Sequence, residues 1–312
     1  MKQIFDDIAG MQKNIQPLNI NGLRGRLLKM PATNKSQAKK EILMVYGSHP
    51  SIERMYGMAE VLADGGNVMM PDLPGMGGMD SFYKIGMKPT LDNMADYLAT
   101  FVKLKYRNKK VTIVGVSLGF VIVTRMLQKY PDLTKRVNIL ISAVGFSHKD
   151  DFRFTRRRWR IYTAGSWALA HRIPAFLFKN IALHPSLIRA VYARTHNAKH
   201  KFKGIDSDTV SKLMEFEITL WRVNDVRTHW RMAYEMLSIN NCDVQVDLPV
   251  HHISAEKDQY FDNAVVEQHM RIIYSDYINY PINPKAHSPS VIANKAAAQE
   301  YVPKKLRKVM SE

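Results

Sequence analysis

The sequence has a single cysteine, Cys242, among 312 residues. One cysteine excludes a disulfide within the chain, so we expect a fold held by its core in a reducing compartment. Apolar runs are also short: none reaches the roughly 20 residues that span a bilayer, and the best candidate, IYTAGSWALA (161–170), is cut off by His171 and Arg172. The N-terminal MKQIFDDIAGMQKN has early acids and lacks the apolar run of a secretory signal. A cytoplasmic location is therefore expected.

Acidic residues are scarce relative to basic ones, with 28 Asp or Glu against 45 Lys or Arg and a formal net charge of +17. A surplus of this size attracts anionic partners such as nucleic acid, lipid headgroups or acidic substrates. It is marked between 151 and 240, where 16 basic residues accompany 7 acidic ones. The sequence has no recognised nucleic-acid-binding motif, which argues against that partner and leaves contact with an anionic membrane as an alternative.

Short apolar runs alternate with amphipathic segments along much of the chain. Such runs are typical of buried parallel strands covered by helices on both faces, so we expect an α/β fold with a mostly parallel central sheet. An Asn-Gly pair inside 18–30 predicts an antiparallel hairpin ahead of that sheet. The expected parallel strands are 42–46, 67–72, 111–116, 137–143, 248–255 and 277–282.

The alternation stops between 147 and 240, where the sequence contains helical segments and no convincing strand. Pro174 and Pro185 stand where helices can begin. We therefore expect a core domain of 1–146 and 241–312, with 147–240 inserted as a helical cap or lid. The C-terminal PKKLRKVMSE is interpreted as a short, solvated last turn.

The stretch VTIVGVSLGF (111–120) places Ser117 between Gly115 and Gly119, at the end of an expected strand and the start of an expected helix. A sharp strand-to-helix turn of this kind exposes a serine hydroxyl, and its strain requires glycine where a Cβ would clash. The turn also presents the backbone N–H of Leu118 at a helix N-terminus, where it can stabilise an oxyanion. Ser117 is therefore the candidate nucleophile.

A nucleophilic serine needs a base and an orienting acid, which follow it in the order acid, then histidine, in a fold of this kind. Asp258 is the chosen acid because it lies in the loop after strand 248–255, whereas Asp262 is expected to cap the next helix. Asp150 or Asp151, after the fourth strand, is the second choice. His287, in the loop after the last strand, is the candidate base.

The other histidines are not candidates for the catalytic base, and the loop 46–54 is expected to supply a second oxyanion donor. His251 and His252 lie inside an expected strand and are interpreted as packing residues, and the His196–His200 pair has no acidic residue close to it in the sequence. We expect no metal site and no cofactor. In YGSHPSIER (46–54), Gly47 allows close backbone approach and the N–H of Ser48 is the second oxyanion donor, while His49 is a loop residue that can line the pocket.

Four segments in order make the chain resemble the α/β-hydrolase superfamily: MVYGSHPSIERM (44–55), PDLPGMGG (71–78), GVSLG (115–119), and Asp258 with His287 in AHSPS. The resemblance covers 18–146 and 245–305, and 147–240 matches the position of the family's variable lid. It implies Ser117 as nucleophile, His287 as base, Asp258 as orienting acid, and Ser48 and Leu118 as oxyanion donors. Two positions depart from the family pattern: Tyr46 replaces a frequent histidine, and Phe120 replaces a small residue.

These features predict a lid-containing serine hydrolase that cleaves a carboxylic ester through an acyl-enzyme. A serine at the nucleophile position disfavours the relatives that use an aspartate ester on halides or epoxides. Alternatives with the same triad are a thioesterase, an acyltransferase, an aminopeptidase-like enzyme and a C–C bond hydrolase; a catalytically weak protein that binds anionic surfaces is another. The lid is rich in aromatic residues, most of which should form its own core while a few face an apolar acyl or alkyl group of a small-molecule substrate. The Arg-rich RFTRRRWRIY (153–162) is expected to be a solvated face, and the alternative is contact with an acidic substrate group or a lipid surface.

Overall fold

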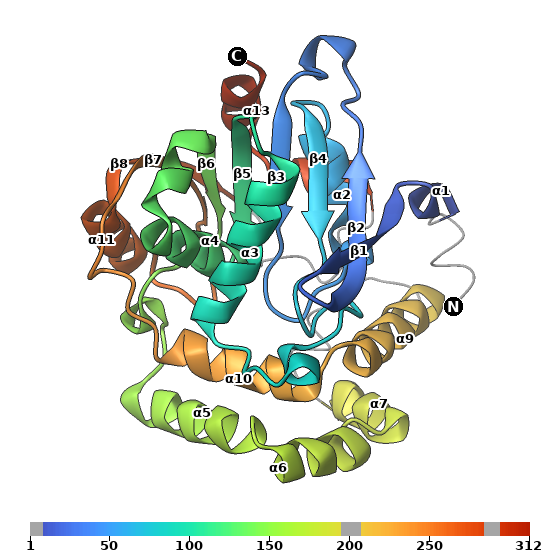
Figure 1. Cartoon of the computed structure of the whole chain (residues 1–312). Helices are drawn as coiled ribbons and strands as arrows, with labels where there is room; N and C mark the ends of the chain where they lie inside the picture. The colour runs from blue at the N-terminus through green and yellow to red at the C-terminus, as the bar shows by residue number, and fades with distance from the viewer. Residues whose placement is uncertain (1–8, 195–206, 284–293) are drawn as a thin grey trace.

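The computed structural model describes residues 9–194, 207–283 and 294–312. An eight-stranded sheet runs through its centre in the order β1-β2-β4-β3-β5-β6-β7-β8 (Figure 1). The pairs β1–β2 and β2–β4 are antiparallel, and all pairs from β4 to β8 are parallel. The strands are β1 (Ile15–Ile20), β2 (Leu23–Met30), β3 (Glu41–Val45), β4 (Asn67–Pro71), β5 (Val111–Val116), β6 (Val137–Ala143), β7 (Val246–Ala255) and β8 (Tyr274–Ile282).

The sequence patterns locate these strands to within a few residues. Asn21 and Gly22 form the tight turn between β1 and β2 with φ of 51° and 80°. Positive φ at both positions is what a two-residue hairpin turn requires, so the Asn-Gly pair explains the antiparallel edge. Every residue of β3 and β5 is buried, as expected for central parallel strands covered on both faces.

Helices cover both faces of the sheet. The pair α3 (Leu91–Lys105) and α4 (Leu118–Lys129) packs together on the face toward the viewer in Figure 1, and α2 (Ile52–Leu62) packs with α12 (Lys295–Gln299) behind the sheet. The helix α11 (Asn263–Ile273) contacts β7 and β8. Apart from the C-terminal helix, the other helical segments outside the 152–240 region are short: α1 (Ala9–Gln12), η1 (Lys35–Gln37), η2 (Phe82–Ile85), η3 (Pro131–Arg136) and η4 (Lys149–Asp151).

The C-terminal segment differs from its interpretation as a solvated turn. It forms the helix α13 (Lys304–Ser311), in which Leu306 and Met310 are buried in the main core. These two apolar residues are four positions apart and so share one helix face, which the dense surrounding charge obscured in the sequence. Lys40 Nζ also donates to the Met310 carbonyl at 3.1 Å, which ties the end of α13 to the sheet.

Between β6 and β7 the described chain is helical, and its elements lie at the carboxyl ends of the parallel strands (Figure 1). We call them the inserted helices: α5 (Arg156–Leu169), α6 (Arg172–Leu177), the π-helical turn η5 (Phe178–Ala182), α7 (Pro185–Arg194), α9 (Ser207–Val223) and α10 (Val226–Leu237). Pro185 is the first residue of α7, as predicted, whereas Pro174 is the third residue of α6. Within the described ranges no helix is both long and apolar enough to cross a membrane.

The chain enters and leaves the inserted helices at adjacent points. His148 and Asn240 form an isolated antiparallel bridge, in which the Lys149 N–H donates to the Ile239 carbonyl at 2.9 Å and the Asn241 N–H to the Ser147 carbonyl at 3.1 Å. The sequence predicts an insertion over 147–240, and its boundaries stay a prediction. Whether the inserted helices act as a lid stays a prediction.

Candidate active site

Ser117 occupies a strained turn between β5 and α4. Its backbone has φ of 49° and ψ of −118°, and it precedes Leu118, the first residue of α4. A positive φ is unfavourable for serine and is found chiefly where surrounding structure imposes it, often at functional sites. The Ser117 N–H donates to the Ala143 carbonyl at the end of β6, at 2.9 Å, which fixes the turn to the neighbouring strand.

Both glycines of the turn are required by close backbone packing. A Cβ on Gly115 would lie 2.5 Å from Phe120 Cα, and a Cβ on Gly119 would lie 2.2 Å from the Val45 carbonyl oxygen of β3. Neither neighbour is a flexible side-chain end, so neither can move aside cheaply. The glycine spacing around Ser117 therefore follows from how tightly β5, α4 and β3 meet.

The Gly47–Ser48 loop, in which the sequence predicts an oxyanion donor, lies directly on this turn. A Cβ on Gly47 would be 3.1 Å from the Val116 carbonyl oxygen and 3.3 Å from Ser117 Cβ, so the two backbones approach closely. Ser48 follows Gly47, and the N–H of Leu118 belongs to the first turn of α4, where it has no acceptor within the helix. The structure thus brings together the Gly47–Ser48 loop, Ser117 and Leu118, as predicted from the sequence.

Tyr46, one of the two departures from the family pattern, anchors this loop. Its hydroxyl donates to Asp72 Oδ1 and accepts from the Leu73 N–H, both at 2.9 Å. The Asp72 carbonyl in turn accepts from the Tyr97 hydroxyl at 2.9 Å. Tyr46 and Asp72 are both completely buried, and burial raises the pKa of Asp72 to about 7 although Arg26 opposes that rise. The tyrosine therefore links the end of β3 to the loop after β4.

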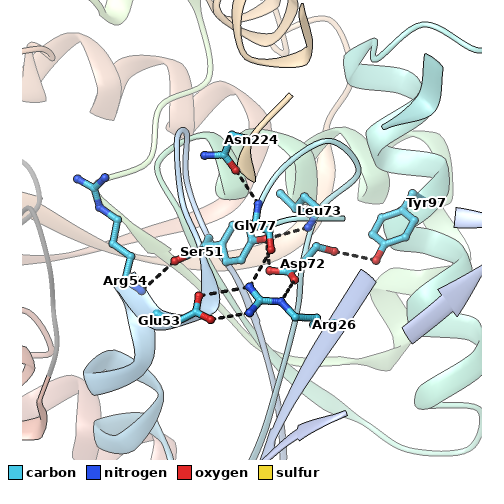
Figure 2. A network of polar contacts seen from close by, with 10 residues as sticks. Arg26, Ser51, Glu53, Arg54, Asp72, Leu73, Gly77, Tyr97 and Asn224 are labelled. Atoms are coloured by element: carbon cyan, nitrogen blue, oxygen red, sulfur yellow. Dashed lines mark hydrogen bonds and ion pairs between the residues drawn. The ribbon is translucent and has the colours of Figure 1, made fainter. Parts of the chain in front are cut away.

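Arg26 extends the same network in three directions. Its guanidinium donates to Asp72 Oδ2 at 2.9 Å, to the Glu53 carboxylate on α2, and to the Gly77 carbonyl at 2.7 Å (Figure 2). Burial alone would raise the pKa of Glu53, but the hydrogen bonds from Arg26 hold it below its ordinary value. The Arg26 guanidinium thus joins β2, α2 and the loop after β4 beneath the site.

The inserted helices attach to this loop through backbone groups. Asn224 Oδ1 accepts from the Gly77 N–H at 2.7 Å, and the Asp225 N–H donates to the Gly75 carbonyl at 2.8 Å. Gly75 has φ of 78°, and a Cβ there would lie 2.5 Å from Thr228 Oγ1 of α10. The glycines of PDLPGMGG therefore serve the contact with α9 and α10 as well as the turn itself, a role that the sequence alone did not indicate.

His49 is a contact point between the Gly47–Ser48 loop and the inserted helices. Its ring centroid lies 4.1 Å from that of Trp221, and its Nε2 lies 3.7 Å from a carboxylate oxygen of Glu217. Arg54 is also 3.7 Å from that carboxylate, which is buried. His229 packs edge-on to Trp221, and desolvation lowers the pKa of His229 to about 4, so this ring is neutral at pH 7. The sequence indicated His49 as a polar loop residue that could line the pocket and did not reveal these partners.

Asp258 lies where the sequence placed it, in the loop after β7. It is buried, and its Oδ1 accepts the N–H groups of Tyr260 and Phe261 at 2.8 and 3.1 Å. Its own N–H donates to Ala255, the last residue of β7. Asp262 caps α11 by accepting from the Ala264 N–H, which confirms its structural interpretation. Because β3, β5 and β7 are parallel, the loops that carry Ser48, Ser117 and Asp258 all meet at one edge of the sheet.

The second-choice acids have other roles. Asp150 is largely exposed, whereas Asp151 is completely buried and its Oδ2 accepts the N–H groups of Ser147 and His148 at 2.7 and 2.9 Å. Asp151 Oδ1 accepts from His269 Nδ1 on α11. Asp151 therefore holds the segment where the chain enters the inserted helices, and Asp258 stays the better candidate for the orienting acid.

His287, His196 and His200 lie outside the described residues. The chain reaches the end of β8 at Ile282, whose carbonyl accepts from the Glu256 N–H at 3.0 Å, so β8 ends beside the loop of Asp258. Within β7, His252 is buried and its Nδ1 lies 2.9 Å from Ser142 Oγ, while His251 Nδ1 lies 3.0 Å from the Tyr280 hydroxyl. Both strand histidines thus fit their interpretation as packing residues.

Phe120, the other departure from the family pattern, is completely buried and packs against Gly145. A Cβ on Gly145 would lie 2.6 Å from the Phe120 ring, whose centroid lies 5.8 Å from that of Tyr274. The space that the family usually obtains from a small residue at 120 is here provided by the absence of a side chain at 145. These positions are 25 apart in the sequence, so only the structure connects them.

The fold and the turn at Ser117 define an α/β hydrolase. Solved structures agree: the chain superposes on an esterase from Thermogutta terrifontis with a TM-score of 0.59 at 15% identity, covering 94% of this chain and 96% of the other. It is similar to MGS-M2, an α/β hydrolase from a Medee basin deep-sea metagenome library, with a TM-score of 0.64, 13% identity and coverage of 95% of each chain. An epoxide hydrolase A from Mycobacterium thermoresistibile gives 0.62 at 14% identity, covering 95% and 96%. At these identities the likeness concerns the fold alone.

Within that class the family is specific. Residues 36–285 match the serine aminopeptidase S33 family of hydrolases, and the chain belongs to it. The match includes Ser48, Ser117 and Asp258 and ends two residues before His287. No curated protein sequence matches the chain significantly.

Proposed function

We propose that the protein is a serine hydrolase that cleaves a carboxylic ester through an acyl-enzyme on Ser117. The observation that carries the proposal is the strained Ser117 backbone, with φ of 49°, at the β5–α4 turn against the Gly47–Ser48 loop. A costly conformation of this kind persists where it serves the chemistry, because it exposes the hydroxyl beside oxyanion donors.

In the proposed reaction, Ser117 Oγ attacks the ester carbonyl carbon and its proton passes to His287. The N–H groups of Ser48 and Leu118 stabilise the negative charge on the carbonyl oxygen. His287 then gives the proton to the departing alcohol, which leaves an acyl group on Ser117. Water, deprotonated by His287, releases the acid and restores the serine. Asp258 orients His287 and stabilises its protonated form, and the inserted helices cover the substrate as a lid.

The test is covalent labelling with a fluorophosphonate combined with a p-nitrophenyl ester assay. The native protein should be labelled at Ser117, and Ser117→Ala should lose labelling and about 10⁴-fold or more of the ester hydrolysis. Alanine fits the same backbone space, so the thermal unfolding of the variant should match that of the parent. A well-folded native protein that neither reacts with the probe nor hydrolyses any ester contradicts the proposal.

A second candidate is hydrolysis of an aminoacyl amide, which the family match to serine aminopeptidases favours. It uses the same Ser117 acyl-enzyme with an amine as leaving group. A panel of esters of different chain length, thioesters and aminoacyl p-nitroanilides separates the two: kcat/KM highest on an aminoacyl anilide would favour the amidase, and highest on an apolar ester would favour the esterase.

A further inference from the structure

The positive charge of this protein is concentrated in one segment. Between 152 and 205 the sequence contains twelve Lys or Arg residues and no Asp or Glu. In the described part, every basic side chain whose burial is known is exposed: Arg153, Arg156, Arg157, Arg158, Arg160, Arg172, Lys179 and Arg189. With a net charge of +17 for the whole chain, this segment accounts for most of the surplus.

The same segment carries most of the exposed apolar side chains. Among the described residues fifteen large apolar side chains are exposed, and eight of them lie between 161 and 187. Ile173 and Phe176 on α6 are 73% and 65% exposed, which are the highest values in that set. Most lid aromatics are expected in the lid core, but Tyr162, Trp167 and Phe176 are exposed. The eight are Ile161, Tyr162, Trp167, Ile173, Phe176, Leu177, Ile181 and Leu187.

Helical geometry places the charges and apolar groups of α5 on one outward face. Residues 159, 163, 166 and 170 form an inward stripe with helical spacing, and Trp159 Nε1 donates to the Leu237 carbonyl of α10 at 2.8 Å. Arg157, Arg160, Ala164 and Trp167 form a separate stripe on the flank of the helix and are exposed. In Figure 1, α5 and α6 form the layer farthest from the sheet, with α10 between α5 and the strands. We call this surface, formed by α5, α6 and η5, the outer face.

We propose that the outer face docks the protein on an anionic lipid surface. Bulky apolar side chains can enter the boundary between headgroups and acyl chains, while neighbouring arginines bind lipid phosphates. Long basic side chains suit this position because their apolar stems follow the buried groups and their charges reach the headgroups. The proposal concerns a surface distinct from Ser117 and holds whether or not Ser117 is a nucleophile.

Charge and polarity favour a lipid surface over other occupants. A second copy of the chain would bring the same six exposed cations of α5, α6 and η5 against this face, with no acid from the segment to neutralise them. A nucleic acid would satisfy the arginines but offers no apolar layer for Ile173, Phe176 and Ile181. An anionic bilayer supplies both the negative charge and the apolar phase.

The first test measures flotation of the full chain with vesicles of phosphatidylcholine containing about 30% phosphatidylglycerol, and with phosphatidylcholine alone. The protein should bind the anionic vesicles and lose binding as salt rises. The triple variant Arg156→Glu/Arg157→Glu/Arg160→Glu should weaken partitioning about 100-fold or more, since each lost cation weakens it roughly fivefold. Acidic residues suit the first turn of α5, which contains Arg156 and Arg157, and Arg160 is exposed, so the fold should be retained.

A matched control makes the same charge change far from the outer face: Lys35→Glu/Lys39→Glu/Lys305→Glu. These lysines are exposed, and η1 and α13 lie at the opposite end of the molecule in Figure 1. The control should keep most of the vesicle binding. Equal loss in both triple variants would mean that net charge alone drives binding, and it would overturn the proposal.

The apolar contribution is tested by Ile173→Ser/Phe176→Ser against Leu104→Ser/Ile272→Ser, which removes exposed apolar side chains elsewhere. The first pair should reduce vesicle binding at least tenfold and the second should not. Equal effects, tighter binding to duplex DNA than to vesicles, or a dimer that Phe176→Ser dissociates without any vesicle binding would each contradict the proposal. Ser117→Ala should bind vesicles like the parent, which separates this proposal from the proposed function.

Discussion

Gly119 and Gly165 are both helical glycines, but they stand in opposite surroundings. A Cβ on Gly119 would lie 2.2 Å from the Val45 carbonyl oxygen, whereas a Cβ on Gly165 in α5 meets no atom of the described residues within 4 Å. The turn under Ser117 is built from backbone against backbone, and the outer helix of the insertion touches its neighbours through side chains on one stripe only. The first region permits little change in sequence, and the second permits much.

The largest expected effect in this comparison is that of Gly119→Ala. The added methyl group cannot be accommodated without moving β3 or α4, so the free energy of unfolding should fall by about 3 kcal/mol or more. Activity should fall too, because the displaced Val45–Tyr46 backbone leads into the Gly47–Ser48 loop. Urea denaturation measures the first effect and ester hydrolysis the second. A variant as stable and active as the parent would show that the contact is looser than the structure indicates.

The second prediction concerns the buried core and the dependence of its stability on pH. Burial lowers the pKa of His252 to about 3, below its ordinary value of 6.5, so the unfolded chain binds a proton there that the folded chain does not. The contribution of His252 to the free energy of unfolding is therefore fully present above pH 6.5 and is lost as the pH falls toward 3. The loss between pH 6.5 and 5 is about 2 kcal/mol. Urea unfolding at several pH values measures the slope.

The control for the titration is His252→Gln, which keeps a polar group near Ser142 but has no proton to gain. Its overall stability should be lower and its dependence on pH in this range shallower. An unchanged slope would assign the acid sensitivity to other groups.

The smallest expected effect is that of Gly165→Ala, and it has the opposite sign from that of Gly119→Ala. Glycine disfavours a helix interior, and the new methyl group enters open space, so the variant should gain about 0.5–1 kcal/mol. Thermal unfolding monitored by circular dichroism would detect a rise in Tm with ester hydrolysis unchanged. A loss of stability would indicate that α5 has a neighbour at this position.

Sequence reasoning worked best where local rules decide the structure. Alternating apolar runs located the strands, the Asn21-Gly22 pair located the hairpin turn, and the glycines around Ser117 located the strained turn. Sequence reasoning could not predict contacts between distant segments. Nothing in the sequence pairs Arg26 with Asp72, or matches Gly145 to Phe120, because the register of packing between elements depends on the whole fold.

The aromatic residues of 159–178 show a second limit. Helical spacing separates one stripe of α5 from another, but it does not say which stripe another helix will cover. The prediction that most lid aromatics form its core therefore could not identify Tyr162, Trp167 and Phe176 as outward-facing. The run of arginines gave a correct expectation of a solvated face and concealed the apolar residues interspersed with it.

The bridge between His148 and Asn240 has a consequence for the length of the segment that it encloses. Because the chain departs from the core and rejoins it within one hydrogen-bonded pair, the length of the intervening segment is uncoupled from the geometry of the sheet. Doubling a flexible loop adds only about 0.6 kcal/mol of closure entropy. The helices between these two residues can therefore change in number or length without altering the strands that carry the Ser117 turn.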